Sequence, residues 1–182
     1  SGDEFGHAVA VSGDTIVVGA SREANSQTTI TNGATASTNN SAETAGAAYV
    51  FSRTGTTWAA QAYLKAPNAE SGDFFGYAVA VSGDTIVVGA YYEDSSQTTI
   101  TNGATASTNN SASAAGAAFV FSRTGTTWAA QAYLKAPNAE SGDCFGRAVA
   151  VSGDTIVVGA FYEASSQTTI TNGATASTNN SA

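Results

Sequence analysis

The stretch that decides the fold is Phe5-Gly6-His7-Ala8-Val9-Ala10-Val11-Ser12-Gly13-Asp14-Thr15-Ile16-Val17-Val18-Gly19-Ala20. Two apolar runs, both with β-branched residues, flank its Ser-Gly-Asp centre. That centre favours a tight turn, because glycine adopts positive φ without steric cost. The stretch therefore predicts a β-hairpin, and it returns almost unchanged at residues 75–90 and 145–160, spaced by 70 residues each time.

The whole chain follows this period. Residues 1–70 and 71–140 align without gaps and differ at nine positions, and residues 141–182 are a partial third copy. We call these three segments unit 1, unit 2 and unit 3. The length of the repeat has to be known before a fold is assigned, because each copy is one structural unit that packs against its neighbours.

Each complete unit contains four predicted strands, which in unit 1 are residues 5–11, 15–20, 46–53 and 58–66. In the fourth, apolar residues recur with the period of two that is typical of a strand with one buried face. Trp58, Ala60, Ala62 and Leu64 alternate with Ala59, Gln61, Tyr63 and Lys65. Long runs of helix-forming residues are missing from the chain.

A polar insert follows the second strand of each unit, at residues 21–45, 91–115 and 161–182. In unit 1, Asn32-Gly33 lies between two Thr-rich arms and favours a type I′ turn. The insert therefore predicts a small protruding hairpin, and a disordered low-complexity loop is the alternative.

Four antiparallel strands in each 70-residue tandem unit predict an all-β fold built of β-propeller blades. Two complete units and a partial third cannot close a ring of about 4–8 blades. We therefore expect an incomplete propeller, or part of a larger assembly that further repeats or other chains complete. An open stack or solenoid of the same units is the structural alternative.

Composition excludes several classes of partner. The net charge of -8 and pI near 4.3 disfavour binding to nucleic acid and to anionic membrane surfaces. No apolar run approaches the roughly 20 residues that cross a bilayer, so we expect no membrane insertion. Charged residues make up only 11% of the chain, and Ser, Thr and Asn take their place, which favours an extracellular or cell-surface protein.

The repeated blocks resemble the FG-GAP repeat, the blade unit of integrin α-chain propellers and of many bacterial extracellular proteins. The resemblance is carried by Phe5-Gly6, Val17-Val18-Gly19-Ala20 and Gly46-Ala47-Ala48-Tyr49-Val50-Phe51, and by their copies in units 2 and 3. The bacterial form fits best. The resemblance implies a propeller that serves adhesion or ligand binding.

The calcium loop of several integrin blades, Asp-x-Asp-x-Asp-Gly, is missing from this chain. The nearest groupings hold Glu70 with Asp73 and Glu140 with Asp143. Calcium takes about 6–8 oxygen ligands from a tight loop, so these four residues are weak calcium candidates. The alternative is that Asp73 and Asp143 cap a turn by accepting backbone N–H groups. We expect no other cofactor.

The positions at which the copies differ are the most informative feature. Folding the hairpin at Gly13 brings residue 4 opposite residues 21–23 and residue 7 opposite 18–20. Eight of the nine variable positions are thus predicted to gather at one rim of each blade, and Tyr49/Phe119 is the ninth. The predicted ligand-binding residues on this variable rim are His7, Arg22, Phe74, Tyr77, Tyr91, Tyr92, Asp94, Arg147, Phe161 and Tyr162.

Tyr, Phe and Arg dominate binding hot spots, so the variable rim suggests recognition of a protein or glycan ligand. Drift after recent duplication is the alternative, although drift does not explain why residues 27–42 are identical to their copies in unit 2 and unit 3. That identity favours a second hypothesis, a structural subunit of an extracellular filament or surface layer built from copies of the chain. Catalysis is not expected, because the lone histidine, His7, is replaced by Tyr77 and Arg147.

Overall fold

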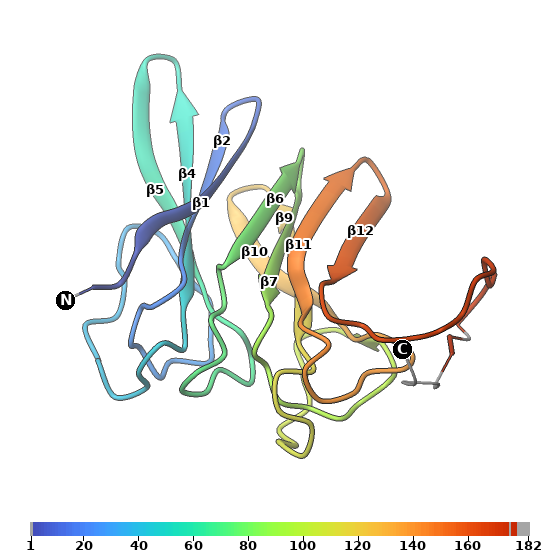
Figure 1. Cartoon of the computed structure of the whole chain (residues 1–182). Helices are drawn as coiled ribbons and strands as arrows, with labels where there is room; N and C mark the ends of the chain where they lie inside the picture. Colours follow the sequence, from blue (N-terminus) through green and yellow to red (C-terminus); the bar gives the residue numbers. More distant parts are fainter. Residues whose placement is uncertain (1, 175, 178–182) are drawn as a thin grey trace.

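The computed structural model describes residues 2–174 and 176–177. Among these residues there is no helix, and the strands form three antiparallel sheets of five, five and two strands that do not close into a ring. Figure 1 shows the sheets side by side, with the hairpin tips at one end and the polar inserts at the other. The all-β prediction is confirmed, and the open arrangement is that of partial propeller blades.

The sheet of unit 1 has the strand order β1-β2-β4-β5-β3. Its strands are β1 (Phe5–Ser12), β2 (Thr15–Ala20), β3 (Thr31–Asn32), β4 (Ala47–Thr54) and β5 (Thr57–Leu64). The predicted hairpin is present, because Val9 pairs with Val18 and Ser12 with Thr15 across a two-residue turn in which Gly13 has φ 55°. The four predicted strands agree with β1, β2, β4 and β5 to within two residues at their ends.

Unit 2 repeats this order as β6-β7-β9-β10-β8. Its strands are β6 (Ala78–Ser82), β7 (Thr85–Ala90), β8 (Thr101–Asn102), β9 (Ala117–Thr124) and β10 (Thr127–Leu134). Unit 3 contributes β11 (Phe145–Ser152) and β12 (Thr155–Ala160), which form the two-stranded third sheet. The first strands of the units, β1, β6 and β11, lie next to one another in a row (Figure 1).

In units 1 and 2 the polar insert differs from both predictions, whereas residues 175 and 178–182 of the third insert lie outside the described residues. Its Thr-rich arms do not pair into a hairpin, and the segment is not a structureless loop. Instead, Thr31 pairs with Tyr63 and Asn32 with Ala62, so that β3 becomes the outer edge of the sheet. The Asn-Gly signal therefore marks a turn at the end of an edge strand, since the partner of β3 is a distant strand.

The expected burial of β5 on one face only is also wrong. The register of β4 and β5 shifts around Gln61, where a bulge interrupts the period of two. Beyond the bulge, Ala62, Tyr63 and Leu64 are all buried, and so is Lys65. The insert of its own unit contacts the end of this strand, where Lys65 Nζ donates to the Asn25 carbonyl at 2.7 Å.

One apolar core runs through units 1 and 2. Val17, Val50 and Leu64 of unit 1 belong to the same buried cluster as Phe75 and Phe121 of unit 2. Each unit thus buries its sheet against the next one, as a blade that cannot exclude water alone is expected to do.

The units approach one another backbone to backbone, which explains why glycine recurs at the same positions of the repeat. A Cβ atom added to Gly19 would lie 2.0 Å from the carbonyl oxygen of Gly76, and one added to Gly89 would lie 1.9 Å from that of Gly146. Real Cβ contacts are never this short, so glycine is required at both positions.

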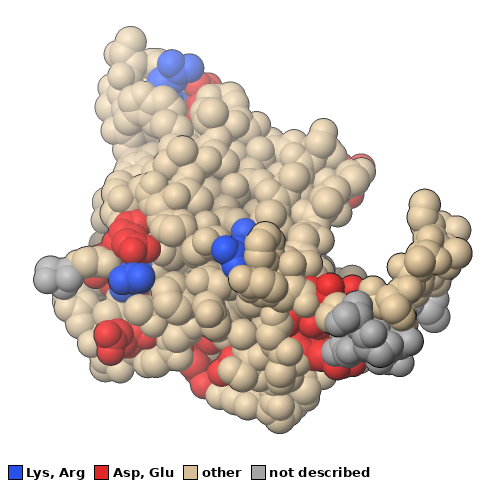
Figure 2. All heavy atoms as spheres, in the orientation of Figure 1, with Lys and Arg blue, Asp and Glu red and all other residues tan. Residues whose placement is uncertain are grey.

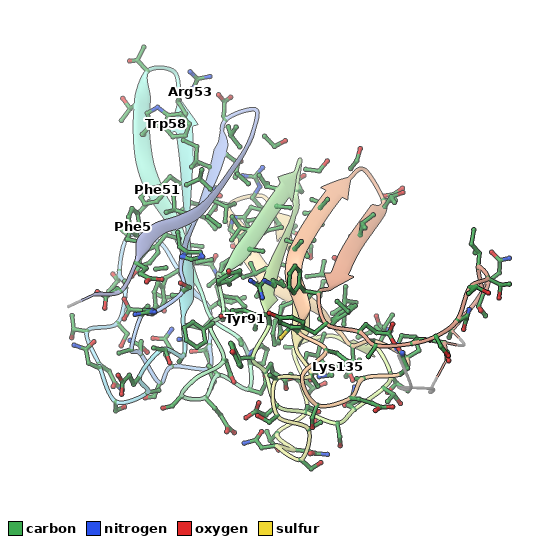
Figure 3. All side chains as sticks on the ribbon, viewed as in Figure 1. Phe5, Phe51, Arg53, Trp58, Tyr91 and Lys135 are labelled. Atoms are coloured by element: carbon green, nitrogen blue, oxygen red, sulfur yellow. The ribbon has the colours of Figure 1, made fainter. Side chains whose placement is uncertain are left out.

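The outer face of unit 1 is open. Phe5 is 59% exposed whereas its copy Phe75 is fully buried, and Trp58 is 44% exposed whereas its copy Trp128 is 1% exposed. The difference arises because unit 1 covers that face of unit 2, while none of the described residues covers the same face of unit 1. Figure 3 shows Arg53 and Trp58 near the tip of the β4–β5 hairpin, with Phe51 and Phe5 farther down the same sheet.

Candidate ligand-binding rim

The variable rim begins with a strained backbone. Glu4, Phe74 and Cys144, which precede the first hairpin strand of their units, have φ values of 54°, 55° and 55°. A residue other than glycine in this left-handed region costs about 1–2 kcal/mol. No unit uses the glycine that would remove the strain, and backbone strain of this kind tends to be kept at functional sites.

In unit 1 the rim is polar. The carboxylate of Glu4 accepts a hydrogen bond from the Ser21 hydroxyl at 2.9 Å. It also lies 3.2 Å from Nδ1 of His7 and 3.1 Å from Nε of Arg22. The predicted register is therefore correct, because residue 4 faces residues 21 and 22 across the hairpin. The Glu4 carboxylate holds the two nitrogen-bearing side chains in place.

In unit 2 the same positions form an aromatic cluster. The ring centroid of Phe74 lies 5.7 Å from that of Tyr91 and 5.5 Å from that of Tyr92, and the Tyr77 and Tyr91 centroids are 4.3 Å apart. Tyr92 remains 42% exposed. Burial, together with the neighbouring Tyr77 and Tyr92, raises the pKa of Tyr91 to about 12. The Tyr91 hydroxyl therefore stays protonated at neutral pH and is a neutral hydrogen-bonding group.

A column of side chains joins the three units along the rim. The His7 ring lies 4.5 Å from the Tyr77 ring. The Arg147 guanidinium lies 6.0 Å from the Tyr77 ring centroid and 4.2 Å from that of Phe161. Arg147 also lies 5.7 Å from the Tyr91 ring and 5.8 Å from the Tyr162 ring. Tyr91 is drawn at the centre of Figure 3, close to the junction of the second and third sheets.

A shallow cavity of about 260 Å³ lies at the same end of unit 1. It is lined by Arg22, Ala24, Glu43 and Thr44, which are all variable positions, and by Gly2 and Asp3. The carbonyl of Thr44 accepts a hydrogen bond from the Phe74 N–H at 3.0 Å. The end of one insert thus adjoins the rim of the next unit.

Two variable positions do not fit the rim as predicted. Asn25 and its copy Ser95 are fully buried in the insert and cannot contact a ligand. Asp94 Oδ1 accepts a hydrogen bond from the Ala114 N–H at 2.7 Å, so this carboxylate holds the end of the insert rather than joining the aromatic cluster. The remaining predicted residues lie together, and their role in binding stays a prediction.

A glutamate follows the second strand of each unit, at Glu23, Glu93 and Glu163. Glu93 is 2% exposed and takes hydrogen bonds at 2.9 Å from both Lys135 Nζ and the Tyr133 hydroxyl. It also accepts one from Asn68 of the preceding unit, again at 2.9 Å. Glu93 is therefore the centre of a buried network that ties unit 1 to unit 2.

Sequence reasoning missed the partners in this network. Lys65 and Lys135 directly follow β5 and β10, in the motif Tyr-Leu-Lys-Ala-Pro, and both are buried. Burial lowers the pKa of Lys65 to about 8 and also lowers that of Lys135, although the nearby glutamate opposes the change in each case. The available signal was a lysine directly after a strand made mostly of apolar residues.

At the weak calcium candidates, the structure shows the turn-capping alternative. Asp73 Oδ2 accepts the Glu70 N–H at 2.8 Å, and Asp143 Oδ2 accepts the Glu140 N–H at 2.7 Å. Among the described residues, no group of three or more His, Cys, Asp or Glu side chains is arranged to hold a metal ion. Calcium binding stays untested.

Charge is unevenly distributed over the view in Figure 2. Acidic groups gather mainly toward the insert end, and basic groups are few. At the hairpin tip, Arg53 pairs with Asp14 at 2.6 Å. This surface gives little support for binding a polyanion.

Comparison with known families identifies the repeat. The profile described as "FG-GAP repeat" matches residues 1–51, 58–121 and 128–175, which together make up most of the chain. No curated protein shows significant similarity to it. Over the described residues, no helix is long and apolar enough to span a membrane.

Proposed function

The chain belongs to the FG-GAP repeat family, and from that premise we propose that it serves adhesion or ligand binding outside the cell through its variable rim. FG-GAP repeats form β-propeller-type domains, are generally non-catalytic and are typically extracellular or surface domains. The proposed ligand is a protein or a glycan.

The aromatic column of the rim carries this proposal. Residues that differ between units meet in space and leave large rings accessible to a ligand. Phe161 and Tyr162 are 62% and 60% exposed, and Tyr92 is 42% exposed. All three rings offer large contact area, and the two tyrosines add a hydroxyl that can hydrogen-bond. Arg147 adds a planar guanidinium cation that stacks on aromatic rings.

The proposal is tested by screening the 182-residue chain against glycan and peptide arrays. A ligand found there should bind at least tenfold more weakly to the double variant Tyr92→Ala/Tyr162→Ala. Trp58→Ala is the matched control, because Trp58 is 44% exposed but lies at the hairpin tip away from the rim. Equal affinity of the rim variant and the wild type would remove the rim from the binding site.

The second candidate function is a structural subunit of an extracellular filament or surface layer. The open outer face of unit 1 supports it, because Phe5, Val9 and Val11 are 59%, 68% and 68% exposed on one strand. A face of this kind, repeated in each molecule, favours head-to-tail contacts between copies. Electron microscopy and light scattering separate the two functions, since long polymers support the filament and discrete particles support the binding module.

A further inference from the structure

One basic side chain on the variable rim differs from all the other lysines and arginines of the chain, which has six in total. Lys65 and Lys135 are buried. Three arginines form ion pairs, namely Arg22 with Glu4, Arg53 with Asp14 and Arg123 with Asp84. Among the described residues, Arg147 is the one half-exposed cation without a carboxylate at ion-pair distance.

The missing counter-ion is a property of the sequence of unit 3 itself. In unit 1, Glu4 lies 3.2 Å from His7 and 3.1 Å from Arg22, and all three residues belong to the same hairpin. Arg147 is the copy of His7, but the copy of Glu4 is Cys144, a buried free thiol. Unit 3 therefore places a cation on the rim where its own hairpin supplies no carboxylate.

Aromatic rings hold this cation in place without neutralising it. The Arg147 guanidinium lies 4.2 Å from the Phe161 ring centroid and 5.7 Å from that of Tyr91, at the junction of units 2 and 3. Cation–π attraction acts within about 6 Å of a ring and orients the planar group. Tyr91, which Figure 3 labels, keeps its proton because burial raises its pKa to about 12, so it adds no negative charge. The positive charge of Arg147 thus remains for a ligand.

The surface beside Arg147 is made of tyrosine rings. The Tyr91 centroid lies 4.3 Å from that of Tyr77 and 4.5 Å from that of Tyr92, which is 42% exposed. Unit 2 has a neighbour on each side, so this surface is complete. The electron-rich face of a ring attracts the C–H groups of a pyranose, and the phenol hydroxyls can hydrogen-bond to those of the sugar. The combination suits a carbohydrate.

An extended peptide fits this surface less well. Peptides of that kind bind chiefly by adding a strand to an unpaired sheet edge. Tyr91 and Tyr92 directly follow β7, and β7 pairs with β6 on one side and with β9 on the other. Backbone pairing at β7 is therefore already taken, and side-chain stacking is what the tyrosines offer.

The charge of the ligand is limited by the charge of the protein. The net charge is -8, and acidic groups gather toward the insert end in Figure 2, so a polyanion would be repelled. A single carboxylate beside Arg147 avoids most of this repulsion. Arginine binds such a group through two parallel N–H···O hydrogen bonds.

Building on the proposed binding function of the rim, we infer that its ligand is a glycan that ends in one carboxylated sugar. The carboxylate pairs with Arg147, and the adjoining sugar ring lies on Tyr91 and Tyr92. Arg147 therefore determines specificity for the acidic sugar, whereas the tyrosines supply contact area for any sugar ring.

The test uses oligosaccharides that end in glucuronic, galacturonic or sialic acid, each paired with a carboxyl-reduced counterpart that carries a hydroxymethyl group instead. NMR titration of the 182-residue chain measures both affinities. We expect at least one acidic member to bind about tenfold more tightly than its counterpart, with shifts at the Tyr91 and Tyr92 amides. Arg147→Gln should reduce this preference to less than about twofold, and Arg147→Lys should restore part of it. The matched control is Arg53→Gln at the hairpin tip, which should keep the full preference.

Amide hydrogen exchange in β11 and β12 checks that the Arg147 variants stay folded. Equal binding of every pair by the wild type, binding of none, or a preference that survives Arg147→Gln would overturn the inference. An acidic peptide that binds through Arg147 would overturn the choice of a glycan. A neutral glycan or peptide that binds independently of Arg147 and is lost in Tyr92→Ala/Tyr162→Ala would also overturn the inference, while the proposed function of the rim would stand.

Discussion

Replacing Gly89 by alanine should detach unit 3 from unit 2. The new Cβ atom would lie 1.9 Å from the Gly146 carbonyl oxygen and 2.9 Å from its carbonyl carbon. A carbon and an oxygen come no closer than about 3.3 Å even in a weak C–H···O contact, so the backbones must separate by more than ~1 Å.

That separation acts on hydrogen bonds that join the two units. The N–H groups of Gly142, Cys144 and Phe145 donate to carbonyls of residues 113–115 at 2.8, 3.0 and 3.1 Å. Stretching three such bonds at about 1 kcal/mol each gives an expected loss of about 3 kcal/mol. Amide hydrogen exchange in β11 and β12 measures the loss directly, because local opening of unit 3 exposes these amides.

Gly159→Ala is the matched control, since it is the same residue of the same motif. Its added Cβ would lie 3.7 Å from Ala148 Cβ and 3.9 Å from the Ala148 carbonyl oxygen, which are ordinary contacts, and Gly159 has no positive φ. Alanine there should be neutral or stabilise by up to about 1 kcal/mol by restricting the unfolded chain. If Gly89→Ala and Gly159→Ala agreed to within about 0.5 kcal/mol, close approach would not be the reason for the repeated glycine.

Three further predictions follow from the same contrasts between copies. Trp128→Ala should lower the free energy of unfolding by about 3–5 kcal/mol and Trp58→Ala by less than about 1, measured by urea denaturation, because only the first ring is buried. Burial raises the pKa of Asp73 from 3.8 to about 7, so between these pH values the folded chain keeps a proton that the unfolded chain loses. The free energy of unfolding should therefore fall by up to about 4 kcal/mol as pH rises from 4 to 8. Thermal melts of Asp73→Asn should show a weaker dependence of stability on pH. Phe74→Gly removes left-handed strain of about 1–2 kcal/mol along with the ring contacts to Tyr91, so calorimetry should show little change in stability while the affinity for a rim ligand falls at least tenfold.

The sequence predicted the local elements well because their signals are local. The Ser-Gly-Asp turn, the β-branched runs and the period of 70 residues together determined the hairpins, the four main strands and the meeting of residues 4, 21 and 22. The edge strand at Thr31 could not be predicted from the sequence, because a two-residue strand depends on pairing with Tyr63 and has no sequence pattern of its own.

The buried network around Glu93 could not be predicted from the sequence for a related reason. Its members come from two units and lie between 2 and 42 residues from Glu93 along the chain. A lysine in a strand is read as solvent-exposed unless the position of a buried carboxylate is known, since an isolated buried charge is strongly disfavoured. Lys135 can be buried because its ammonium group forms an ion pair with Glu93 and donates a hydrogen bond to the Gly116 carbonyl.

Identical sequences in this chain therefore acquire different structural environments from their neighbours alone. β2, β7 and β12 are all Thr-Ile-Val-Val-Gly-Ala, yet five of the six residues of β7 are buried and none of β12 is. Ile30 packs against the core between units 1 and 2, whereas its copies Ile100 and Ile170 are 59% and 92% exposed. A unit with a neighbour on each side buries both its apolar face and its glutamate.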